Sequence, residues 1–302
     1  MKANKEFLYR YLNAYSPVGQ EEEGQAIWRN YVAPFSDEIY TDAYGTSVAT
    51  VLCQKNNHSA LDVVIEAHCD EIAWIITNIE ADGYIRVKRH GGSDNMIAPS
   101  KTVMIHTHTG TKVKGVFGWP AIHTRKAYVE KGYEQEELWV DTGLKDLKAV
   151  NKAGVEVGNL ITFDDPFHEM GDYYVGRSLD NKIGGYITNT PKINKAKDGD
   201  NKGGAGPCVE YTSQNHRGIN KMLREVAAAN KVPVQLTVGS MGNDTVAFFM
   251  ENTPTAILAT PLKYMHTTVE SAHKKDVKYA IKLFVEFLKA LTPEKINKFN
   301  NK

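Results

Sequence analysis

The stretch LDVVIEAHCDE, residues 61–71, decides the fold that the sequence predicts. Residues 61–67 are a short apolar run rich in β-branched side chains, which is typical of a strand buried in a parallel sheet. The run ends abruptly at His68, and open α/β sheets place their functional sites just beyond the carboxyl ends of such strands. We therefore predict an α/β protein with a site that begins at His68.

Asp70 makes His68 a candidate metal ligand. A carboxylate two residues after a histidine can hold one imidazole nitrogen, which leaves the other nitrogen free for a metal ion. The same pair also suits a structural interpretation, with a histidine at a strand end and an aspartate that caps the turn. The local sequence favours neither interpretation over the other.

Two further residues lie where the sequence predicts strand ends. Asp180 follows a short apolar stretch, and His266 follows a predicted strand over 256–260. Alone, such an aspartate is more often a helix cap and such a histidine is more often structural or solvated. Because strand ends converge in space, three candidates in one chain are more informative than each separately.

Composition excludes several classes of function. The 302 residues carry 36 basic and 36 acidic side chains, so a nucleic-acid footprint based on bulk charge and a polybasic membrane anchor are not expected. No run approaches ~18 apolar residues, the minimum for a transmembrane helix. Three scattered cysteines without a CxxC pair argue against a disulfide scaffold, and a cytoplasmic location is expected.

The texture of the chain changes twice. Helical spacing over 4–14 and 21–32 is followed by short strands, and from residue 75 to 163 short alternating strands separated by glycine turns dominate. After residue 180 the α/β pattern resumes, with helices, a further strand, a helix capped by Asp244 and an amphipathic C-terminal helix. We predict a discontinuous α/β domain, 1–74 and 164–302, that carries an inserted β-rich domain, 75–163.

Other candidates carry less weight. His106 and His108 alternate on one predicted strand and are expected to be exposed there, while His123 is expected in a loop. Cys69 has no base near it in the sequence, so it is expected to be a packing residue rather than a nucleophile. The paired glycines lack the strand–loop–helix context of a phosphate-binding loop, which disfavours nucleotide binding.

Six short motifs follow one another along the chain: Ser16-Pro17-Val18-Gly19, Asp42-Ala43-Tyr44-Gly45, Ala67-His68-Cys69-Asp70-Glu71, Leu179-Asp180-Asn181, Gly242-Asn243-Asp244 and Tyr264-Met265-His266. Taken in order, they resemble those of the TET-type di-metal aminopeptidases, a family that includes glutamyl aminopeptidases and members labelled endoglucanase. The resemblance covers nearly the whole chain.

The resemblance implies a zinc-exopeptidase-like three-layer catalytic domain with a β-rich dimerisation domain inserted after the His-x-Asp strand. It also implies cytoplasmic homo-oligomers, commonly dodecamers built from dimers, that act on peptides. His68 and His266 then look like terminal ligands of two divalent ions, zinc or cobalt with manganese as a third option, and Asp180 looks like the bridging carboxylate. Asp70 looks like the residue that orients His68, and Asp244 is a further candidate for contact with the substrate.

The chain departs from the family pattern at one place. The family has a helix after the bridging aspartate, then a strand that ends in paired glutamates, one of them the general base, and another strand that supplies an aspartate ligand. Here residues 184–187 run directly into residues 188–191, and no Glu-Glu pair follows. We expect that a segment is absent from this chain near Ile187 and Thr188.

Three hypotheses of function remain open. The first is a metal-dependent aminopeptidase whose complete chain contains the missing ligands. The second is an inactive assembly or peptide-binding homologue that has lost the general base and part of the metal site. The third, a di-metal hydrolase of sugars, finds neither an aromatic platform nor a carboxylate pair for glycoside chemistry in this sequence.

Overall fold

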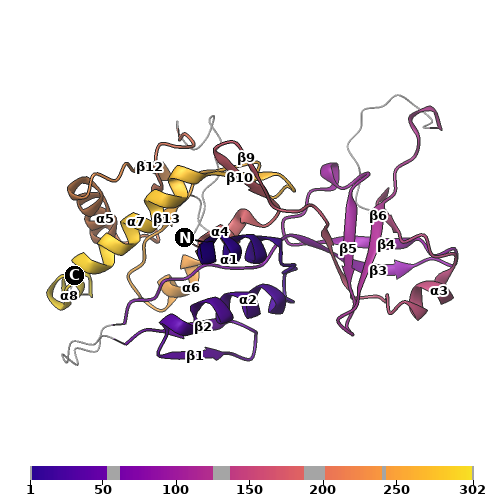
Figure 1. Ribbon diagram of the computed structural model, residues 1–302, viewed down its shortest axis with the longest axis horizontal. Helices are drawn as coiled ribbons and strands as arrows, with labels where there is room; N and C mark the ends of the chain where they lie inside the picture. Colours follow the sequence, from indigo (N-terminus) through magenta and orange to yellow (C-terminus); the bar gives the residue numbers. More distant parts are fainter. Residues whose placement is uncertain (1, 53–61, 125–136, 187–200, 240–242, 301–302) are drawn as a thin grey trace.

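The computed structural model describes residues 2–52, 62–124, 137–186, 201–239 and 243–300. A β-barrel forms one end of the elongated molecule, and most of the helices and three small sheets form the rest (Figure 1). This combination of a mixed α/β part and a β-rich insertion confirms the predicted fold class.

The N-terminal part consists of two helices and a hairpin. Helix α1 buries Phe7, Leu8, Tyr11 and Leu12, a helically spaced stripe that packs against the second helix and the core. The hairpin strands pair antiparallel, and the Asp42 carboxylate closes the turn between them by accepting two backbone hydrogen bonds. The elements are α1 Lys2–Asn13, α2 Glu22–Val32, the 3₁₀ helix η1 Ala33–Phe35, β1 Glu38–Thr41 and β2 Ser47–Thr50.

The β-rich part closes into a six-stranded antiparallel barrel, in the order β3-β4-β7-β6-β5-β8. Alternate residues of its strands point inward, and the edge-to-face contacts of Trp74 with Phe117 and Phe163, at 5.0 and 4.7 Å, anchor the interior. The strands are β3 Ala73–Ile79, β4 Ile85–His90, β5 Thr102–His106, β6 Lys112–Phe117, β7 Trp139–Asp141 and β8 Leu160–Phe163. Helix α3 Leu147–Lys152 and the 3₁₀ helices η2 Asn95–Ile97 and η3 Ile122–Thr124 lie in its loops.

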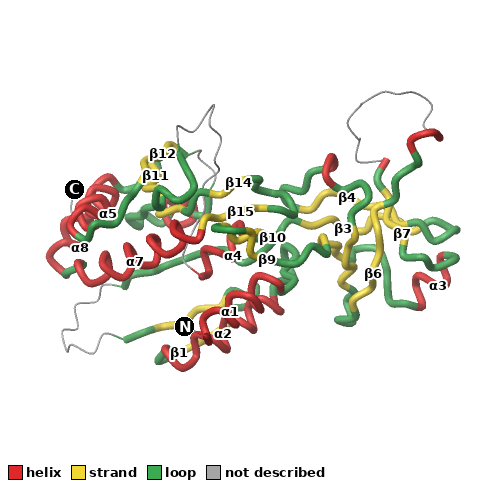
Figure 2. The backbone as a smooth tube through the Cα atoms, turned by 45° about the horizontal axis from the view of Figure 1, so that its top comes forward, coloured by secondary structure: helices red, strands yellow, loops and turns green. Residues whose placement is uncertain are grey.

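The remaining elements form two sheets and five helices. A four-stranded antiparallel sheet, β14-β15-β10-β9, lies between the barrel and the helices (Figure 2), and a three-stranded sheet has the order β12-β11-β13. The strands are β9 His168–Met170, β10 Tyr173–Gly176, β11 Cys208–Tyr211, β12 Gln235–Val238, β13 Leu258–Ala259, β14 Leu262–Lys263 and β15 Glu270–His273. The helices are α4 Leu179–Tyr186, α5 Arg217–Ala229, α6 Thr245–Met250, α7 Lys274–Ala290 and α8 Pro293–Asn300. None of the described helices is both long and apolar enough to cross a membrane.

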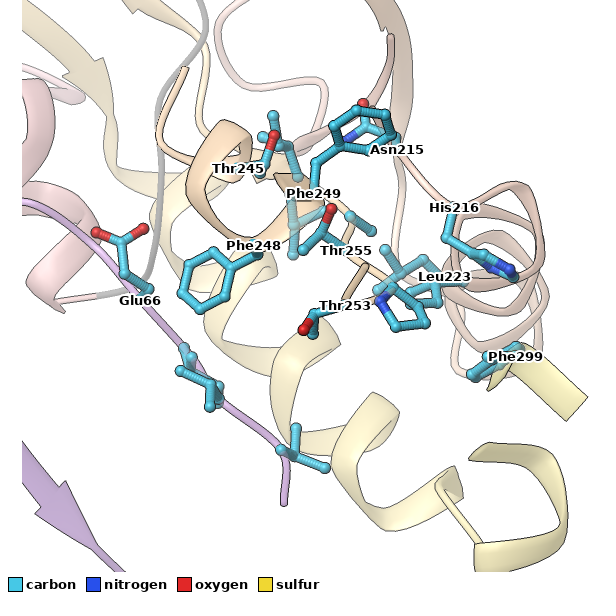
Figure 3. A pocket seen from close by; sticks show the side chains of 18 of the residues that line it. Glu66, Asn215, His216, Leu223, Thr245, Phe248, Phe249, Thr253, Thr255 and Phe299 are labelled. Carbon is cyan, nitrogen blue, oxygen red and sulfur yellow. The ribbon is translucent and has the colours of Figure 1, made fainter. Parts of the chain in front are cut away.

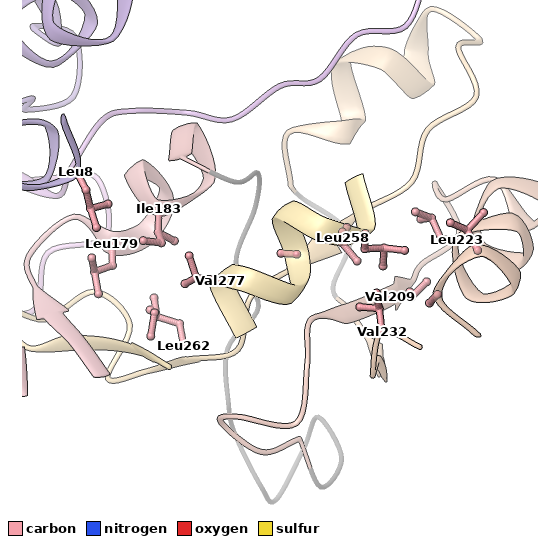
Figure 4. Packing of buried hydrophobic residues seen from close by; sticks show 14 of the residues in the cluster. Leu8, Leu179, Ile183, Val209, Leu223, Val232, Leu258, Leu262 and Val277 are labelled. Atoms are coloured by element: carbon pink, nitrogen blue, oxygen red, sulfur yellow. The ribbon is translucent and has the colours of Figure 1, made fainter. Parts of the chain in front are cut away.

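One apolar core joins these elements around α7. Figure 4 shows Val277 of α7 near Leu179 and Ile183 of α4, with Leu223 of α5 and Val209 of β11 farther along the cluster. Each fully buried side chain of this size contributes roughly 1.5–3 kcal/mol relative to an exposed one. This core fixes α4, and therefore the segment that contains Asp180, against α7.

The strand predicted over residues 61–67 is wrong for the described part, 62–67, which is a loop (Figure 2). Val63, Val64 and Ile65 are 47%, 69% and 48% exposed. A central parallel strand needs a hydrogen-bonded neighbour on each side. In the described part of the chain no strand pairs with this segment, so its apolar side chains stay in solvent. The unpatterned stretch predicted over 188–207 lies mostly outside the described residues.

Candidate functional site

His68 is held in one orientation by Asp70. The His68 Nδ1 atom lies 2.7 Å from Asp70 Oδ1, and both side chains are about one-third exposed. In the neutral imidazole, a carboxylate at Nδ1 fixes the tautomer in which Nε2 carries a lone pair; without a metal ion, the neighbouring carboxylates favour the protonated ring. The free Nε2 of His68 is therefore directed away from Asp70 and toward Asp180.

The structure brings Asp180 between two histidines. Asp180 Oδ1 lies 3.6 Å from His68 Nε2, and Asp180 Oδ2 lies 3.3 Å from His266 Nε2. Asp180 stands at the start of α4, where its own backbone is not yet helical. The three residues, which are far apart in the sequence, thus form one cluster in which each histidine faces a different oxygen of the same carboxylate.

Glu270 positions both Asp180 and His266, and the sequence analysis missed it. Its two carboxylate oxygens accept hydrogen bonds from the backbone nitrogens of Asp180, at 3.0 Å, and His266, at 2.7 Å. Glu270 is 2% exposed, and burial raises its pKa to about 8. No sequence motif marks this residue, because its role depends on two backbone groups 90 and 4 positions away.

Gly92, from the loop after β4, leaves room for the His266 ring. A side chain at Gly92 would put its Cβ 2.7 Å from His266 Nδ1, which is closer than such contacts occur. The backbone at this position must therefore lack a side chain for the His266 ring to fit. Gly92 is one of the paired glycines that the sequence does not favour as a phosphate-binding loop, and its contact with His266 is visible only in the tertiary structure.

In the absence of a metal ion, the neighbouring groups favour a positively charged His68 and a negatively charged Asp180. Burial lowers the pKa of His68, but hydrogen bonds to Asp180 and Asp70 outweigh it and raise the pKa to about 11. Burial raises the pKa of Asp180, and hydrogen bonds to His266 and His68 outweigh it and hold that pKa well below its usual range. The carboxylate of Asp180 is therefore ionised across the physiological range and suited to bind a cation.

Asp244 stands apart from the three-residue cluster. It precedes α6 but makes no side-chain cap, so the predicted capping role is wrong. Asn243 Oδ1 instead accepts hydrogen bonds from Thr245, at 3.2 Å from its backbone nitrogen and 2.5 Å from its hydroxyl. Burial raises the pKa of Glu66, and the negative charge of Asp244 raises it further. Asp244 is thus close to the segment that leads to His68.

His106, His108 and Cys69, the weaker candidates, have structural contacts and lie outside the cluster of His68, Asp180 and His266. His106 is buried, not exposed as predicted, because Tyr15 covers it on the outer face of the barrel, with ring centroids 5.1 Å apart. Its Nε2 lies 2.9 Å from the Thr162 hydroxyl, and burial lowers its pKa to about 4. His108 lies beyond the end of β5, 4.0 Å from Glu156. Cys69 is buried, and burial raises its pKa to about 12, which leaves it a thiol.

A groove of about 990 Å³ runs beside the segment that leads to His68. Residues 62–66 form one wall, and α6, residues 252–258, and parts of α5, α7 and α8 form the others. Figure 3 shows Glu66 and Phe248 projecting into the same space. The exposed apolar residues Val63, Val64 and Ile65 therefore border an open groove rather than a neighbouring strand.

Solved structures with the same fold include an aminopeptidase from the archaeon Desulfurococcus kamchatkensis, with a TM-score of 0.88 and 21% identity over 99% of both chains. Another is the TET1 peptidase of Pyrococcus horikoshii, described as assembling into a tetrahedron or a large octahedral shell. Its TM-score is 0.80 and its identity 21%, over 94% of this chain and 98% of that one. At these identities the structural likeness shows the fold alone.

Comparison of sequences identifies the family as well as the fold. FrvX of Escherichia coli strain K12, named as an aminopeptidase, is 27% identical over 98% of both chains. That alignment is 357 positions long, and 98% of a 302-residue chain is about 296 residues, so about 60 positions hold no residue of this chain. The M42 glutamyl aminopeptidase model matches in two pieces, residues 49–190 and 187–283, which meet at residues 187–190. Since these matches cover most of its length, the chain belongs to the M42 glutamyl aminopeptidase family.

Proposed function

We propose that this protein is a metal-dependent aminopeptidase that removes N-terminal residues from peptides with a water molecule activated by two divalent cations. The observation that carries the proposal is the approach of two imidazole nitrogens to the two different oxygens of Asp180. His68 and His266 would each hold one ion, and Asp180 would contribute one carboxylate oxygen to each. Membership of an aminopeptidase family supports the choice of peptides as substrates.

The spacing of the donor atoms fits this assignment. Two ligands bound at ~2.0–2.1 Å to one tetrahedral ion lie about 3.4 Å apart. The distances from Asp180 to His68 and to His266, 3.6 and 3.3 Å, match that value on both sides of the carboxylate. Imidazole nitrogen and carboxylate oxygen are donors that zinc, cobalt and manganese accept, with zinc and cobalt preferred at nitrogen-containing sites.

The residues around the ligands hold them in place. Asp70 keeps the Nε2 lone pair of His68 directed toward the site, and Glu270 fixes the backbone on which Asp180 and His266 stand. Divalent ions bound here supply an acidified water and polarise the scissile carbonyl. The cluster is only partly exposed, with the Asp180 side chain 13% accessible, and low hydration strengthens every charge interaction in it.

The site needs donors that the described residues do not provide. A tetrahedral ion takes four ligands, while His68 and Asp180 give one ion two side-chain donors, and in the described ranges no three His, Cys, Asp or Glu side chains converge on one point. We propose that the remaining ligands and the general base belong to the ~60 positions present in FrvX and absent here. The two pieces of the family match, which meet at residues 187–190, support that position for the absent segment.

Removal of metal tests the proposed function. Dialysis against a strong chelator is expected to abolish hydrolysis of aminoacyl chromogenic substrates, and Zn²⁺ or Co²⁺ is expected to restore it. An N-acetylated copy of the same substrate serves as the control and should not be cleaved, because its amine can no longer be bound. Activity that survives chelation, with no metal detected in the protein by mass spectrometry, would contradict the proposal. The test is made on the form that contains the absent segment.

We also propose that the barrel mediates self-association into dimers and, from these, a dodecamer. The barrel and its loops expose several large apolar side chains, a feature of surfaces that bind other proteins; they are Tyr84, Met96, Val116, Ile122, Leu147 and Val157. The assembly described for the TET1 relative supports this role.

Light scattering coupled to size exclusion tests the self-association. We expect a dimer or a larger species at micromolar concentration, and a shift toward monomer when Met96, Val116 and Ile122 are all changed to glutamate. Val285→Glu is the matched control, since Val285 on α7 is 44% exposed and Val116 is 46% exposed. A strict monomer of the unaltered protein would contradict the proposed role of the barrel.

A further inference from the structure

A buried cluster of charges lies beside the candidate metal ligands. Arg177 Nη1 donates to both carboxylate oxygens of Glu71, and Lys182 Nζ lies 3.8 Å from Glu71 Oε1. The exposed fractions of the Glu71, Arg177 and Lys182 side chains are 2%, 5% and 0%. Such groups are almost never buried this deeply unless they are paired, so the three side chains depend on one another.

The cluster joins the two chain segments that carry the candidate ligands. Glu71 directly follows Asp70, whereas Arg177 stands three residues before Asp180 and Lys182 two residues after it. Arg177 donates to both Glu71 oxygens from Nη1 and to the Asn13 carbonyl from Nη2, so its planar guanidinium is held at two points and the distance to Glu71 is fixed. The ion pair therefore ties the loop of His68 to the start of α4 within three residues of each ligand.

The loop after α1 holds the same cluster from a third side. Glu71 Oε1 accepts a hydrogen bond from the Ser16 backbone nitrogen at 2.8 Å, and the Glu71 nitrogen donates to the Ser16 carbonyl at 2.8 Å. The cations are anchored there as well: Lys182 Nζ donates to the Ala14 carbonyl at 2.5 Å and Arg177 Nη2 to the Asn13 carbonyl at 2.9 Å. The Ser-Pro-Val-Gly motif, which the proposed reaction does not use, thus belongs to this cluster.

We infer that Glu71 is a positioning residue: with Arg177 and Lys182 it sets the separation between His68 and Asp180 that metal binding requires. The inference rests on the proposed function. A carboxylate buried with two cations stabilises the folded state no more than well-packed apolar side chains of similar volume would. Its value at this point of the fold is geometric, since ligands must be held to within ~0.5 Å for a metal site to form.

Glu71→Asp and Glu71→Gln separate geometry from folding. The aspartate keeps the charge but is one methylene shorter, and the glutamine keeps the length but loses the charge. Asp276→Asn is the matched control, because Asp276 is 0% exposed and accepts backbone hydrogen bonds from Gly204 and Gly206, at 2.7 Å each, without touching the ligands. All variants are made in the form of the protein that contains the segment absent near residue 187. The melting temperature of each variant is recorded with its affinity for Co²⁺, measured by calorimetric titration of the metal-free protein.

Both Glu71 variants are expected to bind Co²⁺ ~10–100-fold more weakly, or below detection while still folded, as for losses of groups that orient ligands. Their amide hydrogen exchange should rise in residues 67–72 and 177–183. Asp276→Asn should lower the melting temperature as much as the Glu71 variants do, but it should leave the Co²⁺ affinity unchanged. Unchanged affinity in folded Glu71→Asp and Glu71→Gln, or an equal loss in Asp276→Asn, would overturn the inference.

A triple variant covers the case in which neither Glu71 variant folds. Replacement of Glu71 by leucine and of Arg177 and Lys182 by methionine removes all three charges together, so no charge is left buried alone. Weak Co²⁺ binding by this folded variant supports the inference, and binding as tight as in the unaltered chain overturns it. If the unaltered protein that contains the segment absent near residue 187 binds no Co²⁺ at millimolar concentration, the proposed function itself is overturned. Loss of Co²⁺ binding in the variants alone leaves the proposed function standing.

Discussion

Replacement of Asp180 by alanine is expected to abolish hydrolysis of aminoacyl chromogenic substrates and to release at least one metal ion per chain. The reason is that Asp180 faces both histidines, with one oxygen 3.6 Å from His68 Nε2 and the other 3.3 Å from His266 Nε2. Without this carboxylate both proposed ions would lose a charged ligand that they share, and the described residues would offer each ion only one neutral donor. Activity assays and metal analysis by mass spectrometry measure the two effects together.

Asp70→Asn is the matched control for this experiment. It changes a carboxylate of the same cluster that touches His68 Nδ1 rather than the proposed ion, so metal affinity is expected to fall by ~10–100-fold without loss of the site. Both variants are made in the form of the protein that contains the segment absent near residue 187. Normal turnover with two bound ions in Asp180→Ala would show that the ligand assignment is wrong.

A recombinant polypeptide of these 302 residues, with a verified mass of 33.7 kDa, is expected to bind metal weakly and to cleave aminoacyl substrates at no measurable rate. The proposed ions have His68, Asp180 and His266 between them, and the sequence after residue 187 contains no glutamate pair to act as general base. A general base alone contributes ~10²–10⁴-fold to such a reaction.

Insertion of the corresponding ~60 residues of FrvX between Ile187 and Thr188 is the complementary experiment. It is expected to restore activity and to bury the apolar residues of segment 62–67, which would reduce binding of a hydrophobic dye. A chimera in which the glutamate pair that the family resemblance predicts for this segment is changed to glutamine controls for folding and should reduce dye binding without restoring activity. Robust aminopeptidase activity from the 33.7 kDa chain would contradict this account, and Asp244 would then be the first replacement base to test by substitution.

Local patterns predicted much of the architecture. Helical spacing predicted α1, α2 and α7, and the change in texture near residue 75 predicted the β-rich insertion that forms the barrel. These predictions succeed because an amphipathic helix or an alternating strand carries its burial pattern within a few residues. Residues 62–67 show the limit of such patterns: their β-branched run is typical of a central strand, but a strand forms only where neighbours supply hydrogen bonds.

The sequence by itself determined which residues are candidates for the site: His68 with Asp70, Asp180 and His266 each stand after an apolar stretch, and their order resembles a known family. Only the tertiary structure decided that one carboxylate lies between two histidines, and that buried Glu270 and the cluster of Glu71, Arg177 and Lys182 hold the segments that carry them. The physical reason is that these supports are contacts between segments more than 80 residues apart, or with backbone groups, and no local spacing encodes such contacts.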